Sequence, residues 1–226
     1  MPSFNIIKNT NSDLSTFRAQ NVIGMFDLQV NNLKETFSGA IPIENIDWNI
    51  GIIFGASGTG KTTIAKELFG DFENFKYSNA SIIDDMPKEK SFKDIIKMFN
   101  SVGFSSPPSW LKPYSVLSNG EKMRVDLARE LLAEKEIVIF DEFTSVVNRE
   151  VAKISSYAVS KAIRRNNKKF IAVSCHDDII DWLEPDWIFN TNNMQFELVK
   201  KKDQASSATY TDASQTYGSF LKSITI

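Results

Sequence analysis

The nine residues Gly55-Ala-Ser-Gly-Thr-Gly-Lys-Thr-Thr63 decide the fold of this chain. They match the pattern G-x-x-x-x-G-K-[ST], in which glycines let backbone N–H groups curl around a phosphate. The charge of Lys61 suits the β- and γ-phosphates, and the hydroxyl of Thr62 suits Mg²⁺. We therefore predict an ATP-binding loop with Mg²⁺ as its cofactor. The predicted phosphate-binding residues are Gly55, Ala56, Ser57, Gly58, Thr59, Gly60, Lys61, Thr62 and Thr63.

The residues on both sides of this loop provide the context that a phosphate-binding loop requires. Residues 49–54 form an apolar run typical of a buried strand. Residues 62–69 continue with apolar positions at helical spacing, so a helix dipole points toward the same anion. A glycine-rich turn that arises by chance is the alternative, and it would lack both flanking elements.

Strands and helices alternate along the rest of the chain, which predicts an α/β fold with a mostly parallel sheet flanked by helices. Residues 34–46 predict two short strands around Ser38-Gly39, and hence a small antiparallel part near the N-terminus. The expected helices cover residues 16–26, 92–99, 122–132 and 147–165, and the expected strands 81–83, 136–140, 169–174, 188–189 and 196–199. We divide the chain into an N-terminal extension (1–33), an ATPase domain (34–202) and a flexible tail (203–226), with a docking end at Phe220-Leu-Lys-Ser-Ile224.

The composition is that of an ordinary globular protein. The chain has 226 residues, 42% of them hydrophobic and 24% charged, with a formal net charge of −2. Cys175 is the only cysteine, which favours a reducing cytoplasm, and no apolar stretch is long enough to span a bilayer. We expect a cytoplasmic protein without direct membrane insertion.

A second acidic motif follows the strand predicted at residues 136–140. This strand ends in Asp141 and Glu142. The carboxyl ends of parallel strands lie beside the phosphate loop, so Asp141 is placed to hold Mg²⁺ through water. Glu142 then points toward the water that attacks the γ-phosphate. A strand that merely ends in solvated acids is the alternative, and the upstream phosphate loop argues against it.

One further motif distinguishes among the phosphate-loop families. Leu117-Ser-Asn-Gly-Glu121 resembles the LSGGQ signature of ABC ATPases, and residues 122–131 resemble the helix that follows it. The order of phosphate loop, signature and acidic strand also matches that family. The sole histidine, His176, lies just beyond the strand predicted at 169–174, where the family has its switch histidine. A satisfied loop histidine is the alternative for this residue.

The resemblance implies a head-to-tail homodimer with two ATP molecules at its interface. Each ATP would lie on one subunit's phosphate loop and contact the signature of the other subunit. Glu142 would act as general base, with His176 contacting the γ-phosphate. The implied signature contacts are Ser118, Asn119, Gly120 and Glu121.

The chain also departs from the family pattern. No glutamine occurs between Lys61 and Leu117, so Asp84 or Asp85 is our candidate for the missing Mg²⁺ contact, although a solvated turn fits equally well. Asn148 stands where the family usually has Asp. Phe37, with Phe26 as a second choice, is our candidate for stacking on adenine, although either is more typical of a core aromatic.

Several stretches, including Trp110-Leu-Lys-Pro-Tyr-Ser-Val and Asp141-Glu-Phe-Thr-Ser, resemble ABC-type ATPases fused to, or encoded near, GNAT-type acetyltransferase domains. We therefore expect a dimeric ATPase switch that serves a protein partner, such as an acetyltransferase, or a nucleic-acid process. Basic residues near 161–169 and 200–202 are more typical of solvated helix ends than of a nucleic-acid surface. A transporter ATP-binding subunit and a non-hydrolysing ATP-binding module are the alternatives.

Overall fold

The computed structural model of the protein describes residues 3–9, 14–28, 34–72, 75–78, 80–133 and 135–199. The expected tail (203–226), with Phe220, and the basic residues 200–202 lie outside the described residues. The first elements are β1 (Ser3–Asn9), α1 (Phe17–Phe26), β2 (Lys34–Ala40), β3 (Ile50–Phe54), α2 (Lys61–Phe69), α3 (Phe92–Ser101), α4 (Pro107–Trp110) and the 3-10 helix η2 (Tyr114–Val116). They are followed by α5 (Asn119–Leu132), β4 (Ile137–Phe140), α6 (Arg149–Arg165), β5 (Lys169–Ser174), α7 (Ile179–Leu183), β6 (Trp187–Asn190) and β7 (Gln195–Leu198).

The main sheet has the strand order β4-β5-β3-β6-β7. Strands β4, β5, β3 and β6 run parallel, and only β7 pairs antiparallel, with β6. Because β5 lies between β3 and β4, the loops that follow these three strands meet at one edge of the sheet. This arrangement confirms the predicted mostly parallel α/β fold and places the phosphate loop beside the acidic motif.

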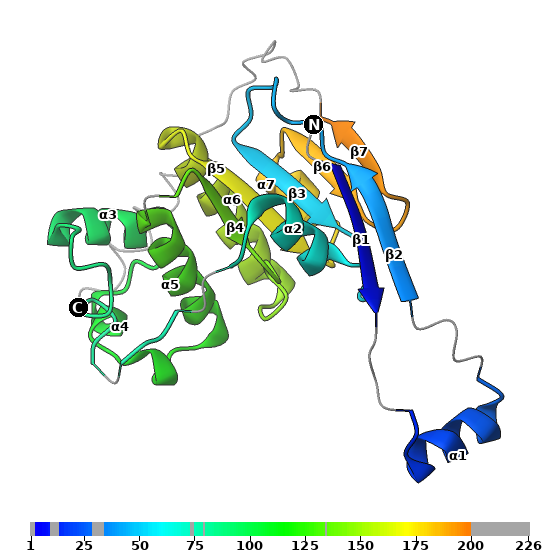
Figure 1. Ribbon diagram of the computed structural model, residues 1–226. Coiled ribbons are helices and arrows are strands. Elements are labelled where there is room, and N and C mark those ends of the chain that lie inside the picture. The colour runs from blue at the N-terminus through cyan, green and yellow to red at the C-terminus, as the bar shows by residue number, and fades with distance from the viewer. Residues whose placement is uncertain are drawn as a thin grey trace.

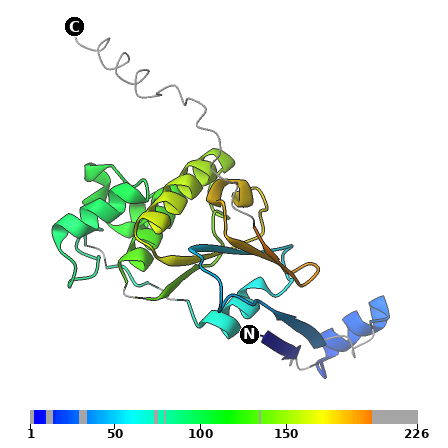
Figure 2. The same ribbon diagram turned by 90° about the horizontal axis from the view of Figure 1, so that it is seen from above.

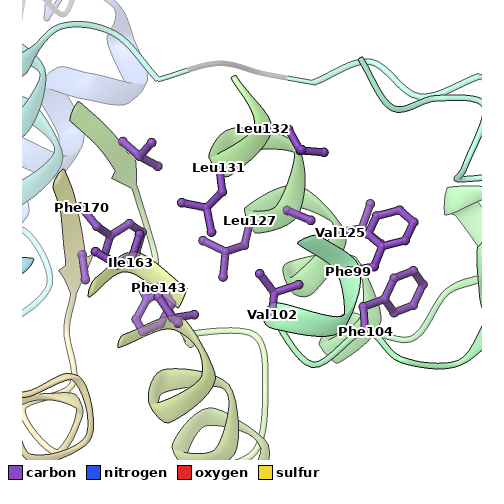
Figure 3. Packing of buried hydrophobic residues seen from close by; sticks show 14 of the residues in the cluster. Phe99, Val102, Phe104, Val125, Leu127, Leu131, Leu132, Phe143, Ile163 and Phe170 are labelled. Atoms are coloured by element: carbon purple, nitrogen blue, oxygen red, sulfur yellow. The ribbon is translucent and has the colours of Figure 1, made fainter. Parts of the chain in front are cut away.

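Helices cover both faces of this sheet (Figures 1 and 2). Alternate residues of β3 point to opposite faces, so Ile52 joins one core cluster and Ile53 the other. Helix α2 packs on one face through Ile64. On the other face, α5 and α6 build the larger cluster, and Figure 3 shows Leu127, Leu131, Ile163, Phe143 and Phe170 meeting there. Each core strand is therefore buried on both sides.

A separate two-stranded sheet joins β1 and β2 in antiparallel register, with Ser3 opposite Ala40. The prediction of a small antiparallel part is confirmed, but the prediction of two strands around Ser38-Gly39 is wrong. Gly39 lies inside β2, where a Cβ would come 2.9 Å from the Phe4 ring. This glycine permits close approach of a ring rather than a turn. Helix α1 lies apart from both sheets in Figure 1, and none of its residues is buried.

The region between α2 and α5 also differs from the prediction. Residues 82–85 form a turn instead of a strand. The backbone N–H of Ile82 donates to Lys112 O, and that of Ile83 to Trp110 O, so both pair with the loop before α5. Helix α5 begins at Asn119, three residues before the predicted start, because Ser118 caps it. Among the described residues, no helix combines the length and the apolar character needed to cross a bilayer.

Candidate functional site

Three loops converge at the carboxyl edge of the main sheet. Strand β3 leads into the phosphate loop, β4 leads into Asp141 and Glu142, and β5 leads toward His176. The register places Phe54 of β3 opposite Ser174 of β5, and Phe140 of β4 opposite Ala172 of β5. The parallel strands therefore bring together the three groups of residues that the sequence analysis assigned to ATP hydrolysis.

The phosphate loop folds around the Lys61 side chain. Its Nζ atom donates to Gly55 O at 2.9 Å and to Ala56 O at 2.7 Å, and the residue is 8% exposed. Gly58 and Gly60 have φ angles of 85° and 84°, which residues other than glycine rarely adopt. These contacts hold the lysine charge and the N-terminus of α2 at the same concave turn, which suits a phosphate group.

Thr62 and Asp141 provide adjacent oxygen donors for a magnesium ion. Thr62 Oγ1 donates to Asp141 Oδ1 at 3.2 Å. Thr62 lies in α2, which follows β3, and Asp141 follows β4, so the contact spans the position of β5 between these two strands. Hydroxyl and carboxylate oxygens are hard ligands that suit Mg²⁺. Burial raises the pKa of Asp141, and the negative charge of Glu142 adds to this effect. A bound cation would offset that cost, so the donor set fits the predicted metal.

Glu142 occupies an unusual backbone conformation directly beside Asp141. Its φ angle is 52°, in the left-handed region that costs a non-glycine residue energy. The Glu142 N–H donates to Asp141 Oδ1 at 3.0 Å, and the next residue, Phe143, donates its N–H to Val173 O at 2.9 Å. Phe143 is fully buried and anchors the turn. The fold thus holds an exposed carboxylate at the sheet edge in a strained position, which is typical of functional residues.

His176 follows β5 at the same edge. Its backbone N–H donates to Ser174 Oγ at 3.1 Å, and Ser174 Oγ donates to Phe143 O at 3.1 Å. This chain of hydrogen bonds connects the turn that carries His176 with the turn that carries Glu142. The imidazole is partly exposed. Its contact with a γ-phosphate stays a prediction.

The signature residues form the N-terminus of α5. Ser118 Oγ accepts from the Glu121 N–H at 3.3 Å, while Glu121 Oε2 accepts from the Ser118 N–H at 2.9 Å, which closes a capping box. Glu121 Oε1 also accepts from Ser109 Oγ at 2.7 Å. The hydrogen bond from the Ser118 backbone lowers the pKa of Glu121, and the Ser109 hydroxyl adds to it. Glu121 is therefore an ionised cap, and its role as a nucleotide contact stays a prediction.

Structural contacts within the protomer engage three of the residues that the sequence analysis singled out, Asp84, Phe37 and Asn148. Asp84 lies on an exposed turn and accepts a hydrogen bond from Ser81 Oγ. Among the described residues, no hydrogen bond joins Asp84 to Thr62, and its role as a metal ligand stays a prediction. Phe37 is buried beneath Gly60, where a Cβ would lie 2.8 Å from its ring, so it acts as a core aromatic. Asn148 Oδ1 caps α6 by accepting from the Val151 N–H at 2.9 Å.

Two residues after β6 support the phosphate loop and were missed by the sequence analysis. Asn192 Oδ1 accepts from the Ala56 N–H at 2.9 Å. Thr191 is buried beside Gly55, where a Cβ would lie 2.2 Å from its Oγ1. Their position after the strand next to β3 is the only signal in the sequence, because β6 ends at the same edge of the sheet.

The predicted basic cluster near the end of α6 is largely occupied within the protomer. Arg164 pairs with Asp186, and Lys169 pairs with Glu136. Lys168 Nζ donates to Leu131 O and Ala133 O at the C-terminus of α5, as expected for a cation at a helix end. These contacts favour the interpretation as solvated or structural charges over a nucleic-acid surface.

Comparison with known proteins places this arrangement in context. No protein-family model matches the chain. A probable metal transport system ATP-binding protein of Thermotoga maritima is 27% identical over 181 residues, which cover 66% of this chain and 75% of that protein. The zinc import ATP-binding protein ZnuC of Buchnera aphidicola subsp. Baizongia pistaciae is 22% identical over 193 residues, which cover 74% and 81% of the two chains.

Solved structures share the fold at lower sequence identity. A dimeric ATP-binding cassette in a post-hydrolysis state, bound to ADP and Pi, superposes with a TM-score of 0.58 at 13% identity. The match covers 74% of this chain and 93% of that one. The structure of cbiO1 from Clostridium perfringens, part of the ABC transporter complex cbiONQ, gives a TM-score of 0.51 at 18% identity, over 63% of this chain and 72% of that one. The fold is that of an ATP-binding cassette.

Proposed function

We propose that this chain, an ABC-type ATPase of the P-loop class by its fold and its relatives, hydrolyses Mg-ATP at the interface of a head-to-tail homodimer. The observation that carries the proposal is the contact between Thr62 and Asp141 beside the buried Lys61. It joins the charge that binds phosphate to the oxygen donors that bind Mg²⁺. Glu142, held at the same edge, is the general base in this proposal.

The partner protomer completes the site. The described residues supply a lysine, metal ligands and a carboxylate, whereas the signature turn of the same protomer begins α5, which lies beside α3 and α4 at the β4 side of the molecule (Figure 1). Ser118, Asn119 and Gly120 lie at the N-terminus of α5, where the positive end of the helix dipole attracts an anion. We assign these three residues to the γ-phosphate of ATP on the partner's phosphate loop. His176 of the first protomer contacts the same phosphate from the sheet edge.

We further propose that ATP-driven closing and opening of this dimer acts on a protein partner away from the membrane. No glutamine occurs between Lys61 and Leu117, where transporter cassettes have the glutamine that couples them to their membrane subunits. The interval between these two residues is also short for a transporter ATPase. The stretches that resemble GNAT-associated ATPases support an acetyltransferase as this partner. Asp84 remains our candidate for the missing metal contact.

An ATP-binding subunit of a transporter is the second candidate. It is favoured by two of the curated relatives, a metal transport system protein and a zinc import protein. The two candidates share the ATPase mechanism and differ in the partner. Affinity purification from membranes separates them, because a transporter subunit copurifies with a membrane protein and a soluble switch does not.

The shared site itself is tested with the Glu142→Gln variant. This substitution removes the base but keeps the size of the side chain, so ATP should bind and remain intact. We expect light scattering to give a dimer with Mg-ATP and a monomer with ADP. Wild-type turnover per protomer should rise with protein concentration, because two copies form each site. A variant that stays monomeric at saturating Mg-ATP, or that retains wild-type turnover, would refute the proposal.

A further inference from the structure

Two tyrosines and one aspartate connect the segment after α2 with helix α5. The rings of Tyr77 and Tyr114 stack with their centroids 3.9 Å apart and an angle of 3° between the planes. The Tyr77 hydroxyl donates to Asp126 Oδ1 and the Tyr114 hydroxyl to Asp126 Oδ2, each at 2.7 Å. We call Tyr77, Tyr114 and Asp126 the tyrosine clasp. Each carboxylate oxygen receives one phenol, so removal of either hydroxyl leaves one oxygen without that donor.

Arg129 reinforces the clasp from the next turn of α5. Its guanidinium carbon lies 4.6 Å from the centre of the Phe75 ring and 4.9 Å from that of Tyr77. Arg129 Nη1 also donates to Lys76 O at 3.1 Å. Residues 75–77 are thus held on α5 through side chains and through the backbone. This segment comes after α2, the helix that starts in the phosphate loop. The clasp therefore connects the phosphate-loop region with the signature helix of the same protomer, and the proposed function assigns these two regions to different ATP molecules.

The electrostatics keep both phenols of the clasp protonated. Burial raises the pKa of both tyrosines, and the adjacent Asp126 carboxylate adds to this effect, so the phenols remain hydrogen-bond donors. Burial also raises the pKa of Asp126, which the two phenols and the Arg129 charge partly offset. A buried carboxylate is costly unless it is hydrogen-bonded. Its retention here favours a specific geometric role over a contribution to stability.

The position of the clasp along α5 determines what it can control. Asp126 follows Ser118 by eight residues, which is about 12 Å along a helix axis. A tilt of roughly 10° about Asp126 would therefore displace the signature turn by about 2 Å, which exceeds the tolerance of a hydrogen bond. The clasp also borders a cavity of about 350 Å³ whose lining includes Asp141, the proposed metal ligand. It thus lies between the signature helix and the metal site.

We propose that the tyrosine clasp is a positioning device that fixes the direction of α5, and with it Ser118, relative to the phosphate-loop half of the same protomer. This inference rests on the proposed shared site. The clasp residues touch neither nucleotide nor metal. They act by presenting the signature turn at the position that a partner's γ-phosphate requires. Loss of the clasp should therefore impair dimer closure and turnover while ATP binding to the phosphate loop persists.

The test uses tyrosine-to-phenylalanine changes, which keep the stacked rings and remove only the hydroxyls. Tyr77→Phe and Tyr114→Phe are made singly and together, and Tyr157→Phe on the exposed side of α6 is the matched control. Nucleotide affinity is measured with a fluorescent ATP analogue, dimerisation by light scattering in the Glu142→Gln background, and kcat in the chain that retains Glu142. We expect the double variant to change affinity less than twofold, to weaken dimerisation at least tenfold and to lower kcat at least tenfold. The control should match the parent in all three.

The outcomes separate this inference from the proposed function. A parent Glu142→Gln chain that stays monomeric with Mg-ATP overturns the shared site and the clasp inference together. A parent that dimerises while the double variant dimerises equally well overturns the clasp alone. Parallel losses of ATP affinity and turnover would also overturn it, because they indicate general damage to the fold. Thermal unfolding of each variant is recorded, and if the double variant unfolds early, the single variants should show smaller losses in dimerisation with unchanged ATP affinity.

Discussion

Two glycines of the phosphate loop offer a direct test of how the loop is supported. Gly58 and Gly60 have almost the same backbone conformation, with φ angles of 85° and 84°. Their surroundings differ, because a Cβ at Gly58 would meet nothing within 4 Å, whereas a Cβ at Gly60 would lie 2.8 Å from the Phe37 ring. Substitution by alanine at each position therefore carries the same backbone cost, and only Gly60→Ala adds a steric one.

The magnitudes follow from these two terms. A non-glycine residue in the left-handed region costs roughly 1–2 kcal/mol, so Gly58→Ala should lower the free energy of unfolding by about that amount. Inserting a carbon into a packed site costs a further 1–3 kcal/mol or so, and Gly60→Ala should therefore lose about 2–5 kcal/mol in total. The steric term alone predicts a difference of roughly 1–3 kcal/mol between the two variants.

Urea unfolding at fixed temperature measures both free energies, with unchanged m-values as the check that only stability has changed. A double-mutant cycle with Phe37→Ala isolates the contact, since the smaller side chain should make Gly60→Ala less costly than it is in the wild type. Nucleotide affinity should fall further for Gly60→Ala, because its loop must move to relieve the contact. Equal free energies for the two alanine variants would refute the idea that Phe37 supports the loop.

Three further substitutions test individual carboxylates, two in the site and one, Asp186, at the opposite edge of the sheet. In Mg²⁺-free buffer, Asp141→Asn should raise Tm at pH 7 and not at pH 3. Because the pKa of Asp141 is raised in the folded state, its carboxyl group stabilises the fold fully below the ordinary aspartate pKa. This stabilisation is lost as the pH rises through the folded-state pKa. A lower Tm at pH 7 would contradict this. Asp186→Asn should cost about 1.5–3 kcal/mol in urea unfolding at pH 7, since the carboxylate accepts from the N–H groups of Asn49 and Ile50. These bonds and Arg164 outweigh burial and lower the pKa of Asp186. The stability advantage of the wild type over Asp186→Asn should therefore be lost as the pH falls below the ordinary aspartate pKa. An advantage that persists in acid would refute the stabilising role of the ionised carboxylate. Glu121→Gln keeps the capping geometry but removes a charge, so it should cost about 0.3–1 kcal/mol of stability and strengthen ATP-driven dimerisation severalfold, with weaker dimerisation as the contrary result.

The phosphate loop, the acidic strand and the parallel sheet could be predicted because each is encoded in consecutive residues. Residues 55–63 carry the backbone chemistry of the loop, and the apolar strands before the loop and before Asp141 carry the sheet. Since parallel strands end at one edge, the contact between Thr62 and Asp141 followed from the order of the motifs alone. The comparisons support the ABC-type ATPase that the signature indicated.

The errors arise where a contact joins distant residues. Strand β1 was missed because its partner, β2, begins 25 residues after β1 ends, beyond α1. Gly39 was interpreted as a turn because its partner, Phe4, lies far away in the chain. The apolar run at 81–83 was assigned to a strand, but Ile82 is buried beneath a turn that pairs with Lys112. Short apolar runs do not distinguish these cases by themselves.

Two departures from the family pattern have a local physical explanation in the caps of α5 and α6. Glu121 replaces the fifth residue of the signature, and its carboxylate satisfies the backbone of Ser118 at the helix start. Asn148 replaces an aspartate, and its amide oxygen accepts from the third N–H of α6. Both side chains make the capping hydrogen bonds at the start of their helices, so these replacements keep the N-termini of α5 and α6 capped. Their effect is therefore expected at the proposed dimer interface. There Glu121 adds a negative charge beside one phosphate site, and Asn148 removes one from the loop after Glu142. ATP-dependent association, rather than folding, measures this effect.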